Sequence, residues 1–276
     1  MTDKFLAKKS LGQNFLTNQH YIQKILQACH LNQEDTVLEI GPGKGALTKY
    51  LIEEARRVTC VEKDRRCVDY LNDNLPADNL KVINQDILQF KIDQLPQNLI
   101  VIGNLPYNIS TPIIKTILDH KHCVSKFLFM VQLEYGDRLV AQPNTKAYGS
   151  LSCFVQYHAR IKKLFTIPPS AFSPAPKIKS CFMEMTFPST SREKAPLNED
   201  HLFSVIQNAF SHRRKTAINS LEKTLNKTIL IETFNELGWN LKQRAEDISL
   251  EDYIKLVNKL EKNGIFNDHS PSSFQP

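Results

Sequence analysis

The residues that most directly suggest chemistry form the run Asn104-Leu105-Pro106-Tyr107. The amide oxygen of Asn104 and the carbonyl of Leu105 can both accept hydrogen bonds from an amino group. Pro106 restricts the backbone and holds that carbonyl in place, and Tyr107 offers a flat ring on which a base can stack. This combination suits recognition of the exocyclic amino group of a nucleobase. Asn and Pro are also common turn residues, so the run alone leaves an ordinary turn open.

Polar groups follow each of the first four strands that the sequence predicts. Short apolar runs rich in β-branched residues predict these strands over 36–40, 58–61, 80–84 and 99–102. Gly41, Glu62, Asp86 and Asn104 stand at or just beyond their carboxyl ends. Because ligands bind at the carboxyl ends of strands in open α/β sheets, we expect these four residues to share one site.

The turn that begins at Gly41 is typical of an adenosine-containing cofactor site. Its glycines allow the backbone to approach a ligand, and Glu62 lies where ribose hydroxyls would bind. Asp86 is expected to accept from the adenine amino group; a helix cap is its alternative role. The spacing also fits a dinucleotide site, so NAD and S-adenosylmethionine both remain open. The residues near Asn104 include no clear partner for hydride transfer, which disfavours NAD.

The second half of the sheet and a proline-rich loop complete the predicted catalytic domain. Three further strands are expected over 126–132, 161–167 and 178–187, which gives a seven-stranded Rossmann-like α/β fold. Phe172 opens the stiff run Phe-Ser-Pro-Ala-Pro-Lys before the last strand. We expect Phe172 to form a second aromatic wall opposite Tyr107. The alternative is an aromatic anchor that fixes the loop to the core.

The sequence predicts two domains with flanking segments. The expected bounds are a basic mobile arm over 1–12, the catalytic domain over 13–190, a small all-α domain over 191–263 and a flexible tail over 264–276. In the helical domain, Arg213, Arg214 and Lys215 follow a predicted helix. They are expected to contact RNA phosphates, although cations also stabilise a helix C-terminus without a ligand.

Composition limits the function classes. The formal charge of +6 permits a nucleic-acid partner. The six cysteines include no Cys-x-x-Cys pair and the eight histidines no obvious ligand spacing, so reduced thiols and no metal are expected. The chain has no long apolar run, and we expect a cytoplasmic protein with no membrane contact, a monomer in the absence of any sign of oligomerisation.

Six motifs together resemble those of the KsgA-type ribosomal RNA adenine dimethyltransferases. They are Gln13-Asn14-Phe15-Leu16, Glu39-Ile40-Gly41-Pro42-Gly43, Asn104-Leu105-Pro106-Tyr107, Phe172-x-Pro174-x-Pro176-Lys177-x-x-Ser180, Arg213-Arg214-Lys215-Thr216 and Arg244-Ala245-Glu246-Asp247. The resemblance runs from about Lys8 to about Leu260. The only local departure that we note is Ala217, where a larger apolar residue is expected.

The resemblance implies a ribosome-biogenesis enzyme that uses S-adenosylmethionine. It would convert two adjacent adenosines in the 3′-terminal hairpin loop of small-subunit ribosomal RNA to N6,N6-dimethyladenosine, with that RNA or the immature small subunit as partner. Carried over by motif position, the cofactor contacts are Asn14, Leu16, Gly41, Glu62, Asp86 and Asn104.

Two alternatives share this fold. An Erm-type enzyme would methylate an adenosine of large-subunit RNA, but the loop that begins at Phe172 and the motifs at Arg213 and Arg244 favour the small subunit. A non-catalytic assembly factor would be expected to have lost the run at Asn104 or Glu62, and this chain retains both.

Overall fold

The computed structural model describes residues 12–187 and 195–266. Most of the expected arm and tail therefore lies outside the described residues. The chain divides into two compact units, Met1–Gly136 with Ala159–Phe187 and Asp137–His158 with Pro188–Pro276. The expected bound at 190 placed residues 137–158 in the larger domain, whereas the structure places them in the second unit.

The first unit contains the predicted seven-stranded sheet. Its strands are β2 (Thr36–Ile40), β3 (Arg57–Glu62), β4 (Leu80–Asn84), β5 (Leu99–Asn104), β6 (Val124–Gln132), β7 (Arg160–Ile167) and β9 (Ser180–Thr186). Their order across the sheet is β4-β3-β2-β5-β6-β9-β7. The first five are parallel to one another, and β9 is antiparallel to both β6 and β7. The prediction of a Rossmann-like sheet is confirmed.

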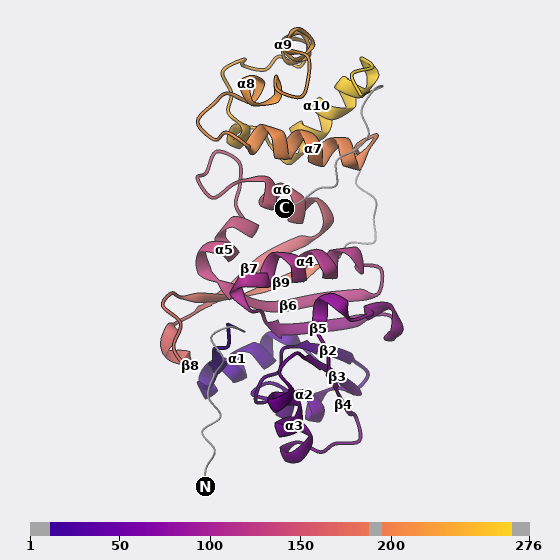
Figure 1. Ribbon diagram of the computed structural model, residues 1–276, viewed down its shortest axis with the longest axis vertical. Coiled ribbons are helices and arrows are strands. Elements are labelled where there is room, and N and C mark those ends of the chain that lie inside the picture. Colours follow the sequence, from indigo (N-terminus) through magenta and orange to yellow (C-terminus); the bar gives the residue numbers. More distant parts are fainter. Residues whose placement is uncertain (1–11, 188–194, 267–276) are drawn as a thin grey trace. The chain divides into compact units, whose positions relative to one another are not determined.

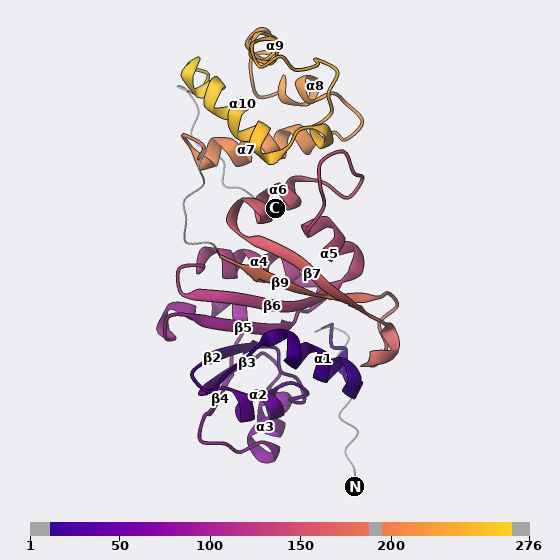
Figure 2. The ribbon, with the colours of Figure 1, turned by 180° about the vertical axis from the view of Figure 1, so that it is seen from behind.

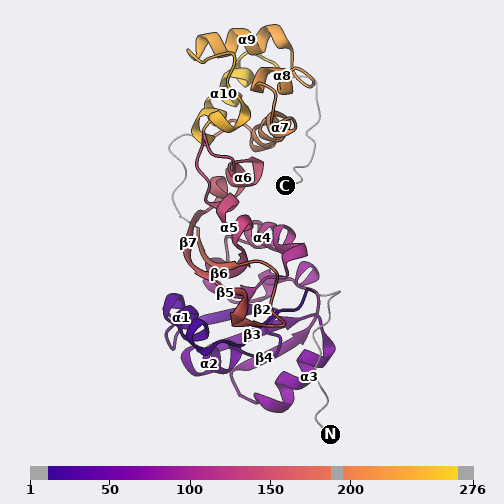
Figure 3. The same ribbon diagram turned by 90° about the vertical axis from the view of Figure 1, so that its left-hand side faces the viewer.

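Helices cover both faces of this sheet. They are α1 (Gln19–Cys29), α2 (Thr48–Glu54), α3 (Arg65–Asn74) and α4 (Ser110–Asp119). Figure 3 shows α1 and α2 on one side of the strands and α3 and α4 on the other, while Figures 1 and 2 show the same unit from front and back. The apolar stripe of α1 is buried because Ile22, Ile25 and Leu26 recur at helical spacing.

Three short 3₁₀ helices in the first unit shape the connections around β5. They are η2 (Ile87–Gln89), η3 (Ile92–Gln94) and η4 (Tyr107–Ile109). The first two lie between β4 and β5, and η4 leads from β5 into α4.

A second, two-stranded sheet in the first unit joins distant parts of the sequence. It pairs β1 (Phe15–Leu16) with β8 (Phe172–Ser173), which follows the 3₁₀ helix η5 (Pro169–Ala171). Leu16 lies opposite Phe172 in the antiparallel register, and both side chains are buried. The N-terminal motif and the proline-rich loop are therefore held together by backbone hydrogen bonds.

The described part of the second unit is helical. It contains α6 (Ser150–His158), α7 (Glu199–Phe210), α8 (Ala217–Leu221), α9 (Lys227–Glu236), η6 (Ala245–Asp247) and α10 (Leu250–Lys262), while α5 (Leu133–Leu139) spans the junction. Phe154 of α6 packs edge-to-face on Phe203 of α7. That contact gives the physical reason why residues 137–158 belong to this unit. None of the described helices is long and apolar enough to cross a membrane.

Candidate active site

The structure brings nine of the predicted site residues to one cavity in the first unit. The cavity has a volume of about 250 Å³ and lies at the carboxyl ends of β2, β3, β4 and β5. Its lining includes Asn14, Leu16, Gly41, Glu62, Asp86, Asn104, Leu105, Pro106 and Tyr107. The parallel order β4-β3-β2-β5 explains this, because it aligns the four strand ends at one edge.

The glycine turn forms the floor of the cavity. Gly41 has φ +64°, and a Cβ added there would meet nothing within 4 Å, so it would project into open space beside the cavity. Gly43 has φ +57°, and its added Cβ would lie 2.9 Å from the Phe15 ring. Both positions therefore require glycine, the first for its conformation and the second also for the close approach of Phe15.

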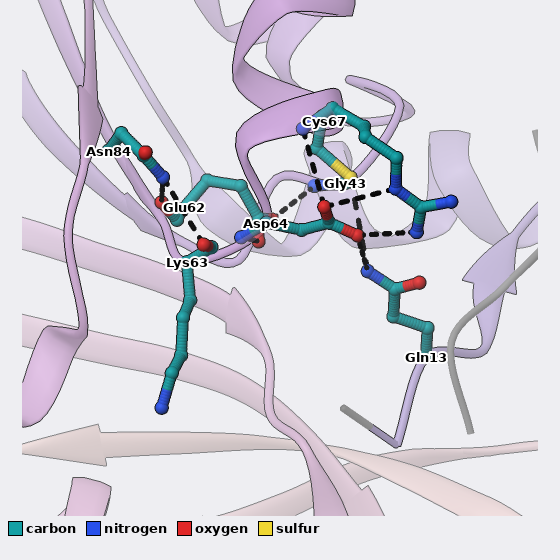
Figure 4. A network of polar contacts seen from close by, with 8 residues as sticks. Gln13, Gly43, Glu62, Lys63, Asp64, Cys67 and Asn84 are labelled. Carbon is teal, nitrogen blue, oxygen red and sulfur yellow. Dashed lines mark hydrogen bonds and ion pairs between the residues drawn. The ribbon is translucent and has the colours of Figure 1, made fainter. Parts of the chain in front are cut away.

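Glu62 is held in a fixed orientation at the end of β3. Its side chain is buried, and its two carboxylate oxygens accept from the backbone N–H groups of Gly43 and Asp64 at 3.1 and 2.8 Å (Figure 4). Burial raises the pKa of Glu62, and the two backbone donors oppose that effect. Each carboxylate oxygen has a further lone pair with which it can accept from a ligand hydroxyl.

Gln13, which also lines the cavity, is hydrogen-bonded to Asp64 after β3. The Gln13 amide donates to Asp64 Oδ2 at 3.0 Å (Figure 4). Arg66 pairs with the same carboxylate at 2.7 Å. The Gln13–Asp64 contact links the N-terminal motif to the turn after β3. Our sequence analysis assigned no role to Gln13; the available signal was its place beside Asn14 in that motif.

Asp86 takes the helix-cap role considered for it, while its contact with an adenine amino group stays a prediction. One carboxylate oxygen accepts from Leu88 N at 3.0 Å and caps η2, while the other pairs with Lys63 Nζ at 2.7 Å. The Lys63 ammonium group holds the pKa of Asp86 below its ordinary value. The carboxyl group also lines the cavity, where Lys63 is a further lining residue that the sequence analysis missed.

Asn104 is oriented by the N-terminal motif. Its Nδ2 donates to the backbone carbonyl of Asn14 at 2.9 Å. Because the two polar atoms of an amide point in different directions, this bond turns Oδ1 away from Asn14. Leu105 N donates to Met130 O at 3.1 Å and anchors the next residue to β6. The structure thus fixes which atom of the Asn104 amide is the acceptor.

Tyr107 is fixed by a residue from the far end of the proline-rich motif. Its hydroxyl lies 2.7 Å from Ser180 Oγ, and Ser180 is fully buried at the start of β9. Burial raises the pKa of Tyr107, so the phenol stays protonated at neutral pH. Ser180 is the last residue of its sequence motif, and the sequence alone indicated no role for it.

Phe172 is not part of the cavity lining to which Tyr107 belongs. It is only 4% exposed and belongs to the apolar core with Leu16 and Phe182. The physical reason is the β1–β8 pairing, which places Phe172 beside Leu16. The alternative role, an aromatic anchor for the loop, describes its position better.

Glu39 is a second buried carboxyl at this site. It is 3% exposed, and its Oε2 accepts from Thr48 Oγ1 at 2.6 Å and from Cys60 Sγ at 3.4 Å. Burial raises the pKa of Glu39 to about 7, against the effect of these two donors. Glu39 is a lining residue of the same cavity as Glu62.

In the second unit, the predicted RNA contacts differ from one another. All three side chains lie after α7 and are exposed, but Arg213 donates to Lys146 O at 2.6 Å and pairs with Glu246 at 3.2 Å. Among the residues that the structure describes, the side chains of Arg214 and Lys215 form no hydrogen bond or ion pair. Arg213 therefore connects two motifs of its own unit, while its two neighbours face solvent.

Comparison with known proteins gives a consistent result. The chain matches the family model of ribosomal RNA adenine dimethylases over residues 4–262. It is 41% identical to proteins named ribosomal RNA small subunit methyltransferase A from Streptococcus thermophilus and Streptococcus pyogenes, over 95% of this chain and 94% of each relative.

Solved structures show the same fold. A dimethyladenosine transferase from Plasmodium falciparum is 25% identical with a TM-score of 0.77, covering 91% of this chain and 98% of that one. The 23S rRNA methyltransferase ErmE, 24% identical with a TM-score of 0.69 over 90% of this chain and all of that one, shows the fold alone. From the family model and the close relatives, this chain belongs to the ribosomal RNA adenine dimethylase family.

Proposed function

We propose that this protein uses S-adenosylmethionine to dimethylate N6 of two adjacent adenosines in the 3′-terminal hairpin loop of small-subunit ribosomal RNA. The observation that carries the proposal is the Asn104 amide, oriented by Asn14 O at 2.9 Å in the cavity that also holds Glu62 and Asp86. Family membership and the 41% identical relatives named small subunit methyltransferase A support the substrate class. An enzyme of this kind works where ribosomes are assembled, which in a bacterial cell is the cytoplasm.

The lining of the cavity fits the adenosine part of S-adenosylmethionine. Glu62 offers two fixed carboxylate oxygens for the ribose hydroxyls, and Asp86 offers an acceptor for the adenine amino group. Ile87 is apolar and suits the ring face. Gly41 leaves open space where any side chain would intrude. When bound, the cofactor supplies an electrophilic methyl group on a sulfonium centre.

The chain's own residues raise the reactivity of the target nitrogen. The lone pair of an adenine amino group is delocalised into the ring, so the planar ground state is a poor nucleophile. Acceptors at Asn104 Oδ1 and the Leu105 carbonyl favour the pyramidal nitrogen of the transition state over that ground state. No residue has to remove a proton beforehand, because methylation itself acidifies the nitrogen. The proton then leaves to solvent.

Tyr107 holds the base in place. Its ring lines the cavity, and the Ser180 contact at 2.7 Å fixes its orientation. Stacking on an aromatic ring contributes about 1–3 kcal/mol per base. We assign no stacking role to Phe172, since it is buried in the apolar core.

The test is to map methylated adenosines by mass spectrometry after incubating the protein with labelled cofactor. The substrates are immature small subunits and, separately, large-subunit RNA. We expect N6,N6-dimethyladenosine at two adjacent positions of the small-subunit RNA only. Methylation confined to large-subunit RNA would replace the proposal by the Erm-type alternative, and no methylation of either would contradict the enzymatic role.

A variant pair ties the activity to the site. Asn104→Ala is expected to lower the rate about 100- to 1,000-fold while RNA binding persists, because one transition-state hydrogen bond is lost. Asn74→Ala, an exposed asparagine at the end of α3, is the matched control and is expected to retain full activity. Equal activity in both variants would remove Asn104 from the mechanism.

A further inference from the structure

A group of metal-ligating side chains lies at the opposite edge of the sheet from the candidate active site. Asp93 lies in η3, and His120, His122 and Cys123 form the turn between α4 and β6. The turn is attached to the amino end of β5, where Leu99 N donates to Cys123 O at 2.8 Å. Asn104 lies at the other end of that strand. The group is therefore separate from the cavity.

The spacing of the donor atoms is close to that of a coordination sphere. His122 Nε2 lies 3.1 Å from Asp93 Oδ1, and His120 Nε2 lies 3.5 Å from Asp93 Oδ2. One ligand atom each from Asp93, His122 and Cys123 lie within 4.8 Å of one another. Around a tetrahedral Zn²⁺, neighbouring ligand atoms are roughly 3.3–3.6 Å apart, given the usual bond lengths. The distances from Asp93 to the two histidines are close to this separation, whereas the group of three with Cys123 is wider and does not include His120.

The hydrogen bonding of His120 turns its Nε2 toward Asp93. Its Nδ1 lies 2.7 Å from Thr116 O, and a carbonyl can only accept, so Nδ1 carries the hydrogen. In the neutral ring the Nε2 lone pair then faces the Asp93 carboxylate. Two acceptors facing each other require a proton or a cation between them. A histidine whose other ring nitrogen donates to a backbone carbonyl is also the usual arrangement of a metal ligand.

The donor set limits the type of ion. Cys123 offers sulfur, the two histidines nitrogen and Asp93 oxygen. Hard cations such as Mg²⁺ and Ca²⁺ take oxygen ligands almost exclusively, whereas Zn²⁺ accepts all three donor types. Cys123 is buried while Asp93 and His122 are exposed, so an ion could reach the group from solvent.

We propose that Asp93, His120, His122 and Cys123 form a binding site for one Zn²⁺ ion, which joins η3 to the turn before β6. The sequence analysis expected no metal because the six cysteines include no Cys-x-x-Cys pair and the eight histidines show no obvious ligand spacing. The site's position at the amino ends of the strands gives the ion a structural role. It does not depend on the proposed methyl transfer.

The test uses the full, untagged chain, freed of metal with a chelator and titrated with Co²⁺ as a spectroscopic probe. We expect one equivalent to bind, with visible bands of tetrahedral Co²⁺ and a thiolate charge-transfer band, both abolished by adding Zn²⁺. A chain that binds no Co²⁺ or Zn²⁺ saturably at one equivalent would overturn the proposal.

Matched variants locate the ion. His122→Ala is expected to weaken Zn²⁺ binding at least tenfold, and Cys123→Ser to abolish the charge-transfer band. His20→Ala, an exposed histidine of α1, is the control and is expected to bind like the wild type. The His122 and Asp93 side chains are each 60% exposed, so His122→Ala and Asp93→Asn are expected to fold. Equal affinity in His122→Ala and His20→Ala would assign the ion to another place.

Discussion

The two units use charged and polar side chains in different ways. In the first unit, Glu39 and Glu62 are buried and accept hydrogen bonds from fixed donors around one cavity. In the second unit, Arg213 and Glu246 form an ion pair at the surface, with the Arg213 side chain 54% exposed. Residues of both arrangements belong to sequence motifs that indicated the same family. A motif alone therefore does not tell whether its polar residues serve a ligand or the fold.

The difference is one of energetics. A buried carboxylate loses its hydration, and hydrogen bonds from nearby donors must offset that cost. Removing or neutralising such a group therefore has a large effect on stability or binding. A surface ion pair in water contributes at most about 1 kcal/mol. If this comparison is correct, substitutions in the first unit change binding and pH dependence, whereas substitutions of the exposed pair change only local order.

The largest effect on cofactor binding is expected for Glu62→Gln. The amide retains one acceptor oxygen but turns an NH₂ group toward one of the two backbone donors, Gly43 N or Asp64 N. The loss of a charge-assisted bond and the donor–donor contact should cost roughly 2–3 kcal/mol. Affinity for S-adenosylmethionine, measured by calorimetry, is expected to fall at least tenfold. Glu53→Gln on the exposed face of α2 is the control, and equal affinities for the two variants would remove Glu62 from the cofactor site.

A pH-dependent effect, on stability and not on cofactor binding, is expected for Glu39→Gln. The pKa of Glu39 is about 7 in the folded chain against 4.5 for an ordinary glutamate, so the folded state holds the proton more tightly. The stability that this proton contributes is present below pH 4.5 and is lost as the pH rises to about 7. Compared with Glu39→Gln, the wild type should therefore lose up to about 3 kcal/mol over this interval.

Denaturant unfolding of both proteins between pH 4 and 8, without cofactor, measures this difference. It is expected to be smallest at pH 4 and to become constant above pH 7. A difference that does not change with pH would mean that folding leaves the pKa of Glu39 unchanged, which would contradict burial as the dominant effect on this group.

Most of the site could be predicted because it depends on strand ends. Gly41, Glu62, Asp86 and Asn104 each follow an apolar run that is too short for a helix, and parallel strands bring their carboxyl ends to one edge. That inference needs only the strand positions and the rule for parallel sheets. It does not require knowing which side chains from distant segments contact one another.

The parts that were missed depend on pairings between distant segments. Tyr107 and Ser180 are 73 residues apart, and no local pattern links them. The β1–β8 pair joins strands of two residues each, too short to give an alternating pattern, and it is what buries Phe172. Likewise, the apolar pattern of α6 indicates a buried helix but not the helix against which it packs.

The smallest effects are expected in the basic cluster after α7. Three consecutive residues there allow an internal role and a ligand-facing role to be compared. Arg213→Ala removes the contacts to Lys146 O and Glu246, so it should lower stability by no more than about 1 kcal/mol. It should also speed hydrogen exchange of Asn144 N–H, which donates to Glu246 O at 2.8 Å. Arg214→Ala combined with Lys215→Ala should leave that exchange rate unchanged, because both side chains face solvent.

The double variant should instead change RNA binding. If Arg214 and Lys215 contact phosphates, the slope of log affinity against log salt concentration should fall by roughly 1–2 units, since each neutralised phosphate contributes about 0.7–0.9. Filter binding to the small-subunit RNA over a range of salt concentrations measures this slope. An unchanged slope, with exchange of Asn144 unaffected, would mean that these cations serve only the end of α7. The contrast between an internal and a ligand-facing role would then exist only in the first unit.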